Sequence, residues 1–177
     1  PKHIEAVVEN RGKTSAKPQM SPCSKDTGKG DPKILEELAP YHAFHYRSDV
    51  GKILYVSSGR FDLQYTCKLL GEQMSTPLRL GGQRLERCAR YLAGHHDLVL
   101  RFDHQVRQSG SRIPSDSNWA EVPERYSTHA GCEFVCVHLI DSWVGTDQER
   151  ALSTVEAELY GIVDACARGV QTKHAME

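Results

Sequence analysis

The stretch that decides the fold runs from SDSNWA (115–120) to ALSTVEAELYG (151–161). Ser153 and Glu156 have the spacing of a capping box, which predicts a helix that begins near Ser153. The apolar runs between the two peptides are short and interrupted, and they predict an antiparallel hairpin over residues 131–145. This order would bring Asp116, at a strand end, near Glu158, at a helix start. Two such carboxylates are the minimum for holding a divalent metal against a phosphate.

The helical spacing after Ser153 predicts which side of this helix is buried. A stripe at the helical period is formed by Val155, Leu159, Ile162, Val163 and Cys166. Glu156 and Glu158 lie at similar angles on opposite flanks of that stripe, so geometry does not choose between them as ligands. Each carboxylate also has a structural explanation, since Asp116 suits a turn and Glu156 suits a helix cap.

The residues before this stretch have mainly helical patterns. Ile4, Val7 and Val8 form a short apolar stripe, and residues 11–32 have a linker composition. A helix is predicted from Asp31 to its stop at Pro40, and helical spacing continues to Gly94. Strand-like runs follow at 98–102 and 134–140, and a third begins at Trp143. The sequence therefore predicts an α+β protein.

Composition narrows the classes of protein. The 177 residues carry a net charge of −1 and a mean hydropathy of −0.51, with no apolar run long enough to span a membrane and no signal peptide. We therefore expect an intracellular protein, of unspecified compartment. The six cysteines form no CxxC pair, which argues against a zinc site or a disulfide framework, and most are expected to be small buried side chains. The start at Pro1 suggests a segment of a longer protein.

A basic strip is the second candidate site. Arg84, Arg87 and Arg90 are predicted to lie opposite the Leu85, Cys88 and Leu92 side of one helix, where they would suit nucleic-acid phosphates. A solvated helix surface is the structural alternative.

Several peptides together resemble one protein family. YRSDVGKILYVSSGRFDL (46–63), QRLERCARYLAGHHDLVLRF (83–102), SDSNWA and ALSTVEAELYG are similar, in this order, to motifs of Ty1/copia-type retrotransposon Pol polyproteins. Phe61 and the peptide SRIP (111–114) depart from the family pattern, and Pro114 fits an edge or a strand end better than a central strand. The resemblance implies a polymerase remnant and linker (1–32), a helical connection subdomain (33–96) and the N-terminal half of an RNase H-like domain (97–177), an incomplete unit of antiparallel strands plus the first helix.

The resemblance also implies a chemistry. RNase H cleaves RNA in an RNA:DNA hybrid with two Mg²⁺ ions about 4 Å apart, held by carboxylates. Asp116 and Glu158 match two of these catalytic metal ligands, whereas the family's other two come from a later strand and helix. The polymerase motif Tyr-x-Asp-Asp does not occur. The chain is therefore expected to be inactive alone, and whether it is an enzyme stays open. Its expected partners are an RNA:DNA hybrid or the rest of a Pol polyprotein.

A function of another class is also compatible with these residues. A retroelement remnant could serve as a noncatalytic structural or nucleic-acid-binding subunit of a larger assembly. In that case the carboxylates would lie apart or without metal, and the basic strip would carry the binding.

Overall fold

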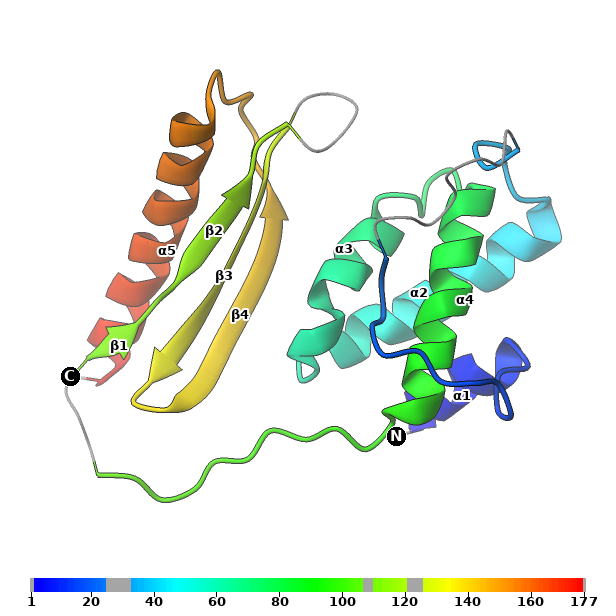
Figure 1. Ribbon diagram of the computed structural model, residues 1–177, viewed down its shortest axis with the longest axis horizontal. Helices are drawn as coiled ribbons and strands as arrows, with labels where there is room; N and C mark the ends of the chain where they lie inside the picture. Colours follow the sequence, from blue (N-terminus) through cyan, green and yellow to red (C-terminus); the bar gives the residue numbers. More distant parts are fainter. Residues whose placement is uncertain (1, 25–32, 107–109, 121–125, 177) are drawn as a thin grey trace. The chain divides into compact units, whose positions relative to one another are not determined.

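The computed structural model describes residues 2–24, 33–106, 110–120 and 126–176 of the chain, which divides into two compact units (Figure 1). The first unit, Pro1–Val99, is helical, and the second, Leu100–Glu177, combines a small sheet with one long helix. The predicted α+β class is confirmed. The three predicted segments, with breaks after residues 32 and 96, are defined by their resemblance to parts of a Pol polyprotein. The two units are defined by contacts within the structure and do not test that assignment, which stays a prediction.

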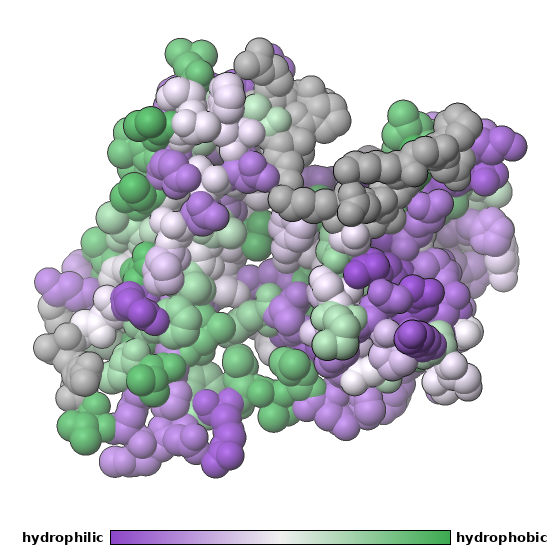
Figure 2. Space-filling view, in the orientation of Figure 1, coloured by the Kyte–Doolittle hydropathy of each residue, from purple (hydrophilic) through white to green (hydrophobic). Residues whose placement is uncertain are grey.

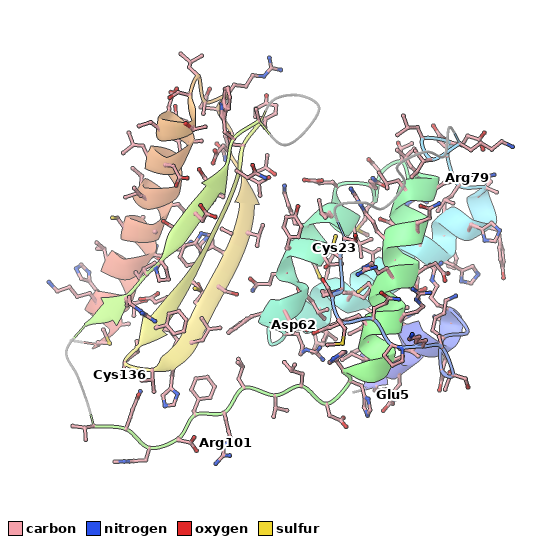
Figure 3. All side chains as sticks on the ribbon, viewed as in Figure 1. Glu5, Cys23, Asp62, Arg79, Arg101 and Cys136 are labelled. Atoms are coloured by element: carbon pink, nitrogen blue, oxygen red, sulfur yellow. The ribbon has the colours of Figure 1, made fainter. Side chains whose placement is uncertain are left out.

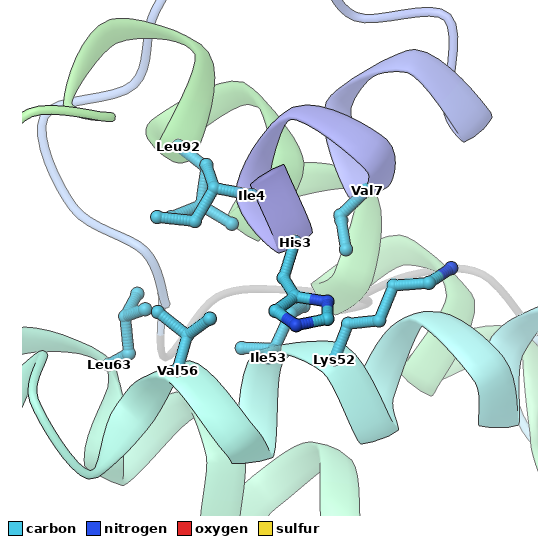
Figure 4. A pocket seen from close by; sticks show the side chains of 8 residues that line it. All are labelled: His3, Ile4, Val7, Lys52, Ile53, Val56, Leu63 and Leu92. Atoms are coloured by element: carbon cyan, nitrogen blue, oxygen red, sulfur yellow. The ribbon is translucent and has the colours of Figure 1, made fainter. Parts of the chain in front are cut away.

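Helices α1 (Lys2–Asn10), α2 (Pro40–Ser57), α3 (Gln64–Gly71) and α4 (Arg79–Gly94) and the short 3₁₀ helix η1 (Phe61–Leu63) form the first unit. The apolar side of each helix points into one core. Figure 4 shows Ile4 and Val7 of α1 facing Ile53 and Val56 of α2, with Leu92 of α4 beside them. Residues with no exposed surface include Val7, Val50, Leu63, Leu70, Leu85, Cys88 and Leu92.

Pro40 begins a helix instead of ending one. Residues 33–38 form turns and a single bridge from Glu37 to Leu78, so the predicted helix from Asp31 to Pro40 is wrong in the described residues 33–39. Proline has no backbone N–H, and the N–H groups of the first helical turn have no partner within the helix, so proline suits the first position of α2. The same missing N–H also allows proline to end an earlier helix. The local pattern could not distinguish these two roles.

Buried polar side chains fix the helices of the first unit to one another. Tyr46 of α2 is fully buried and donates a 2.7 Å hydrogen bond to the carbonyl of Leu70 in α3. Burial raises the pKa of Tyr46 to about 12, so it remains a donor at neutral pH. The buried Asp49 of α2 accepts hydrogen bonds from Asn10 and Arg11 at the end of α1.

A second polar cluster joins η1 to α4. Asp62, labelled in Figure 3, accepts two hydrogen bonds from Arg60 and one from Tyr91. Burial opposes the ionisation of Asp62, but the hydrogen bonds from Arg60 and Tyr91 outweigh it and hold the pKa of Asp62 below its usual value. Tyr91 also stacks on His95 at a ring-centroid distance of 4.5 Å.

The second unit is a four-stranded antiparallel sheet with helix α5 (Thr154–Met176) on one face (Figure 1). Strands β1 (Ser111–Arg112) and β2 (Ser115–Asn118) pair end to end along one side of β3 (Thr128–Val135), and β4 (His138–Thr146) pairs along the other. Pro114 lies at the break between β1 and β2, as its missing donor predicts. The predicted hairpin over 131–145 is confirmed.

Two strand predictions are wrong in detail. Residues 98–102 form no strand, because their Leu98, Val99 and Phe102 side chains are exposed and their backbone is not paired in a sheet. The apolar run 134–140 is not one strand, because the chain turns at residues 136–137, where Cys136 has a φ of 55°. The interruption between β3 and β4 therefore falls inside the apolar run.

Helix α5 begins as predicted but buries the opposite side. The Ser153 hydroxyl accepts a hydrogen bond from the Glu156 N–H, and the Glu156 carboxylate accepts one from the Leu152 N–H. The predicted buried stripe is exposed, and the side that faces the sheet consists of small residues, with Ala157, Gly161 and Ala165 buried. Small side chains let the helix lie close to the strands.

The cysteines are less buried than predicted. Cys67 and Cys88 are buried, whereas Cys23, Cys132 and Cys136 are half-buried and Cys166 is exposed, so the expectation holds for a minority of them. All six are free thiols. Among the described residues, no helix has the length and apolar character needed to cross a membrane.

Candidate metal and nucleic-acid sites

Strand β2 and helix α5, which carry the two matched peptides, pack directly against each other. A Cβ atom added to Gly161 of α5 would lie 3.9 Å from the backbone oxygen of Asp116 and 3.9 Å from the Cβ of Ser117. These are ordinary van der Waals distances, so at Gly161 the helix lies one side-chain carbon away from contact with the strand. The peptides SDSNWA and TVEAELYG are neighbours in space although a hairpin separates them in sequence.

Asp116 is exposed and projects from the sheet on the side away from α5. Successive side chains of a strand point to opposite faces, and Ser117 points toward Gly161 of α5. The Asp116 carboxylate accepts a 3.0 Å hydrogen bond from the neighbouring Ser117 N–H. Asp116 is also on an edge strand, so its carboxylate is open to solvent.

Glu158 is half-exposed and lies on the flank of α5 nearer to the β1–β2 edge. Gly169 is about 20° from Glu158 around the helix axis, and a Cβ added to Gly169 would overlap the side chain of Ile113, between β1 and β2. Asp164, on the other flank, lies toward β3 and β4. The tertiary structure therefore brings Asp116 and Glu158 to the same edge of the unit. Asp116, however, is on the face of the sheet that points away from α5.

The described residues contain no group of three or more His, Cys, Asp or Glu side chains arranged to hold a metal ion. Asp116 and Glu158 supply the hard oxygen donors that Mg²⁺ prefers, but Mg²⁺ requires near-octahedral coordination, with water or substrate completing two protein ligands. The residue types therefore fit Mg²⁺, whereas the orientation of Asp116 does not direct its carboxylate toward α5.

A histidine that no sequence prediction included lies between two carboxylates. The Nδ1 atom of His129 lies 2.6 Å from Oδ1 of Asp147, and its Nε2 atom lies 3.6 Å from Oδ2 of Asp164. These residues line an open cavity of about 490 Å³ together with Glu149 and Tyr160. The two aspartates approach different ring nitrogens, so they do not converge on one metal position.

No sequence motif indicates this histidine cluster. His129 pairs with Gly145 across the β3–β4 ladder, and Asp147 follows two residues later. A Cβ added to Gly145 would lie 2.8 Å from Nε2 of His129, so the glycine provides the space that the imidazole occupies. Only knowledge of the strand register could have identified this arrangement, because the residues are ordinary when taken one at a time.

The predicted basic strip lies on α4 and is partly buried. Arg84, Arg87 and Arg90 are half-buried, and the Nε atom of each is buried without a hydrogen-bond partner. Arg84 is close enough to Tyr46 to lower the pKa of that phenol, against the larger effect of burial. Leu85, Cys88 and Leu92 are fully buried on the core side of α4, as the spacing predicted.

Comparisons with known proteins relate the chain to retrotransposon polyproteins. It is 29% identical over 122 residues to the Retrovirus-related Pol polyprotein from transposon RE1 of Arabidopsis thaliana, and 29% identical over 122 residues to that from transposon RE2. Each match covers 67% of this chain and 8% of the polyprotein. The predicted relationship to retrotransposon Pol polyproteins is confirmed.

A longer match relates the chain to a shorter protein. It is 27% identical over 172 residues to an uncharacterized mitochondrial protein of Arabidopsis thaliana, covering 89% of this chain and 68% of that protein. No family model matches the sequence, and no solved structure matches it.

Proposed function

We propose that the chain is a piece of a copia-type reverse transcriptase/RNase H polyprotein, whose parent cleaves the RNA of RNA:DNA hybrids. The observation that carries the proposal is the strand–hairpin–helix order of the second unit, with SDSNWA on β2 and TVEAELYG on the helix packed against it. The relationship to Pol polyproteins supports it. On this proposal, residues 97–177 correspond to the first half of an RNase H-like domain.

In this proposal Asp116 and Glu158 would hold Mg²⁺ in the complete domain. Bound Mg²⁺ supplies an activated water and stabilises the leaving oxygen of the phosphodiester. The chain's own contribution is to place one carboxylate on an edge strand and another on the adjacent helix flank. Because Asp116 projects from the face of the sheet opposite α5, the helix that carries Glu158, we infer that Mg²⁺ binds weakly or not at all to this chain alone.

The purified chain is expected to show no Mg²⁺-dependent cleavage of an RNA:DNA hybrid. Hydrolysis needs both metal ions positioned together, and misplacement of catalytic groups removes several kcal/mol of transition-state stabilisation. Cleavage of a labelled hybrid over a range of Mg²⁺ concentrations measures this. Cleavage that disappears in Asp116→Asn but persists in Asp103→Asn, a matched exposed carboxylate, would show that the chain completes the site.

The alternative is a noncatalytic nucleic-acid-binding or structural subunit of a larger assembly, and the α4 arginines favour the binding form. The three arginines recur every third residue along α4, and each side chain is only partly buried. A row of such groups suits the phosphates of a nucleic-acid backbone.

Replacing Arg84, Arg87 and Arg90 together by glutamine tests this alternative. If each contacts one phosphate, the negative slope of log K against log salt concentration should become less steep by roughly 3, and hybrid affinity should decrease uniformly across sequences. Fluorescence anisotropy of a labelled hybrid measures both quantities. Arg101→Gln, at an exposed arginine outside α4, is the control. An unchanged salt slope in the triple variant would contradict the binding role.

A further inference from the structure

The side of α5 that faces away from the sheet is an exposed apolar stripe. It consists of Val155, Leu159, Ile162, Val163, Cys166 and Val170, and the five aliphatic members keep 50–76% of their surface exposed. Figure 2 shows hydrophobic residues gathered along the outer side of this helix. The sheet already occupies the opposite side of α5, so the stripe is not needed for packing within this unit. A continuous exposed apolar patch of this kind marks an interaction surface.

The stripe is symmetric about the midpoint between Ile162 and Val163. Val155 and Val170 lie equally far from that midpoint, and so do Leu159 and Cys166. A second copy of α5 that crosses antiparallel at the midpoint would therefore meet apolar residues at every stripe position. Successive members Val155, Leu159, Ile162 and Cys166 also alternate spacings of four and three residues, which is the seam of two packed helices.

The charges at the two ends of α5 favour the same arrangement. The first turn carries Glu156 and the last turn carries Lys173 and His174. An antiparallel pair places the acidic end of each helix beside the basic end of the other and opposes the two helix dipoles. A parallel pair would place like charges together, so the antiparallel orientation is favoured.

We propose that two copies of this chain associate through α5, packed antiparallel with the apolar stripe in the interface. The stripe extends over about 24 Å of helix. One helix pair buries less than the roughly 800 Å² per partner of a standard stable interface, so the dimer is expected to be weak, with a micromolar dissociation constant. This inference depends on α5 alone and does not require the proposed RNase H ancestry.

Sedimentation velocity over a range of protein concentrations tests the association. The full chain is expected to pass from monomer to dimer, and Leu159→Glu is expected to raise the dissociation constant by roughly 100-fold, because it places an unpaired carboxylate in the interface. Val137→Glu is the matched control, since Val137 is 77% exposed in the β3–β4 turn. A chain that stays monomeric, or a dimer that Leu159→Glu leaves unchanged, would overturn the proposal.

Disulfide cross-linking under copper-catalysed air oxidation tests the orientation. In the antiparallel pair, a thiol introduced by Leu159→Cys lies opposite the partner's Cys166, and a linked dimer should form that is lost when Cys166→Ser is added. The two native Cys166 residues would be about 10 Å apart along the axis, beyond disulfide reach. Efficient linkage through Cys166 in the unmodified chain would indicate a parallel pair and refute the arrangement. Circular dichroism of each variant confirms that the exposed substitutions leave the helices folded.

Discussion

Replacing Gly131 by valine is expected to destabilise the sheet-and-helix unit by about 3 kcal/mol, the upper part of the range for overpacking a filled site. Gly131 lies on β3 opposite Trp143 of β4, and any Cβ atom at this position would overlap the indole ring. Trp143 is itself held beneath α5, where the Arg168 guanidinium lies 4.4 Å from the ring centroid. The ring therefore cannot move aside without disturbing the contact between helix and sheet.

Tryptophan fluorescence during urea unfolding measures this effect selectively. Both tryptophans, Trp119 and Trp143, belong to the second unit, so the signal reports that unit alone. Ala130→Val is the matched control, because it introduces the same side chain on the same strand but on the opposite face. The control is expected to change the free energy of unfolding by less than about 1 kcal/mol. An equal midpoint for Gly131→Val and the unmodified chain would show that Trp143 does not fill this space.

Replacing Asp49 by alanine is expected to destabilise the helical unit by about 3 kcal/mol, as removal of one member of a buried ion pair does. The Asp49 carboxylate is 1% exposed and lies 2.8 Å from Arg11 Nε and 3.1 Å from Lys52 Nζ. Asn10 donates a further hydrogen bond to it at 2.9 Å. Its loss would leave the largely buried Arg11 without its carboxylate partner and release the end of α1 from α2.

Circular dichroism at 222 nm during unfolding measures the Asp49 effect, and hydrogen exchange of α1 locates it. Asp103→Ala removes the partner of an ion pair whose two side chains are 84% and 70% exposed, and it is expected to cost less than about 1 kcal/mol. The unfolding transition followed by tryptophan fluorescence should be unchanged in Asp49→Ala, because Asp49 lies in the first unit and both tryptophans lie in the second. Equal decreases in the free energy of unfolding for the two substitutions would show that the buried ion pair of Asp49 contributes no more than an exposed one.

Sequence-based predictions were correct where a local pattern is compatible with only one structure. The capping residues Ser153 and Glu156 predicted the start of α5, and the interrupted apolar pattern predicted the β3–β4 hairpin. They were wrong where one pattern fits two structures. Pro40 could end one helix or begin another, and the run 98–102 has strand composition without a strand partner.

The side of α5 that packs on the sheet illustrates why periodicity was insufficient. Helical spacing identified an apolar stripe, and burial was assigned to it on hydrophobicity alone. The structure buries Ala157, Gly161 and Ala165 instead, because close approach to β2 and β3 requires small side chains. Helix α5 has one side of large apolar residues and one side of small residues, and either can pack on a sheet. The helix sequence alone therefore does not decide which side is buried.

By itself the sequence determined the α+β class, the order of helices and strands over much of the chain, and the relationship to retrotransposon Pol polyproteins. Those properties depend on local spacing and on peptides that keep their order. Only the tertiary structure decided that Asp116 projects away from α5, that His129 lies between two aspartates, and that the apolar stripe of α5 is exposed. These features depend on strand register and on which helix side approaches the sheet, and both are set by contacts between residues far apart in the chain.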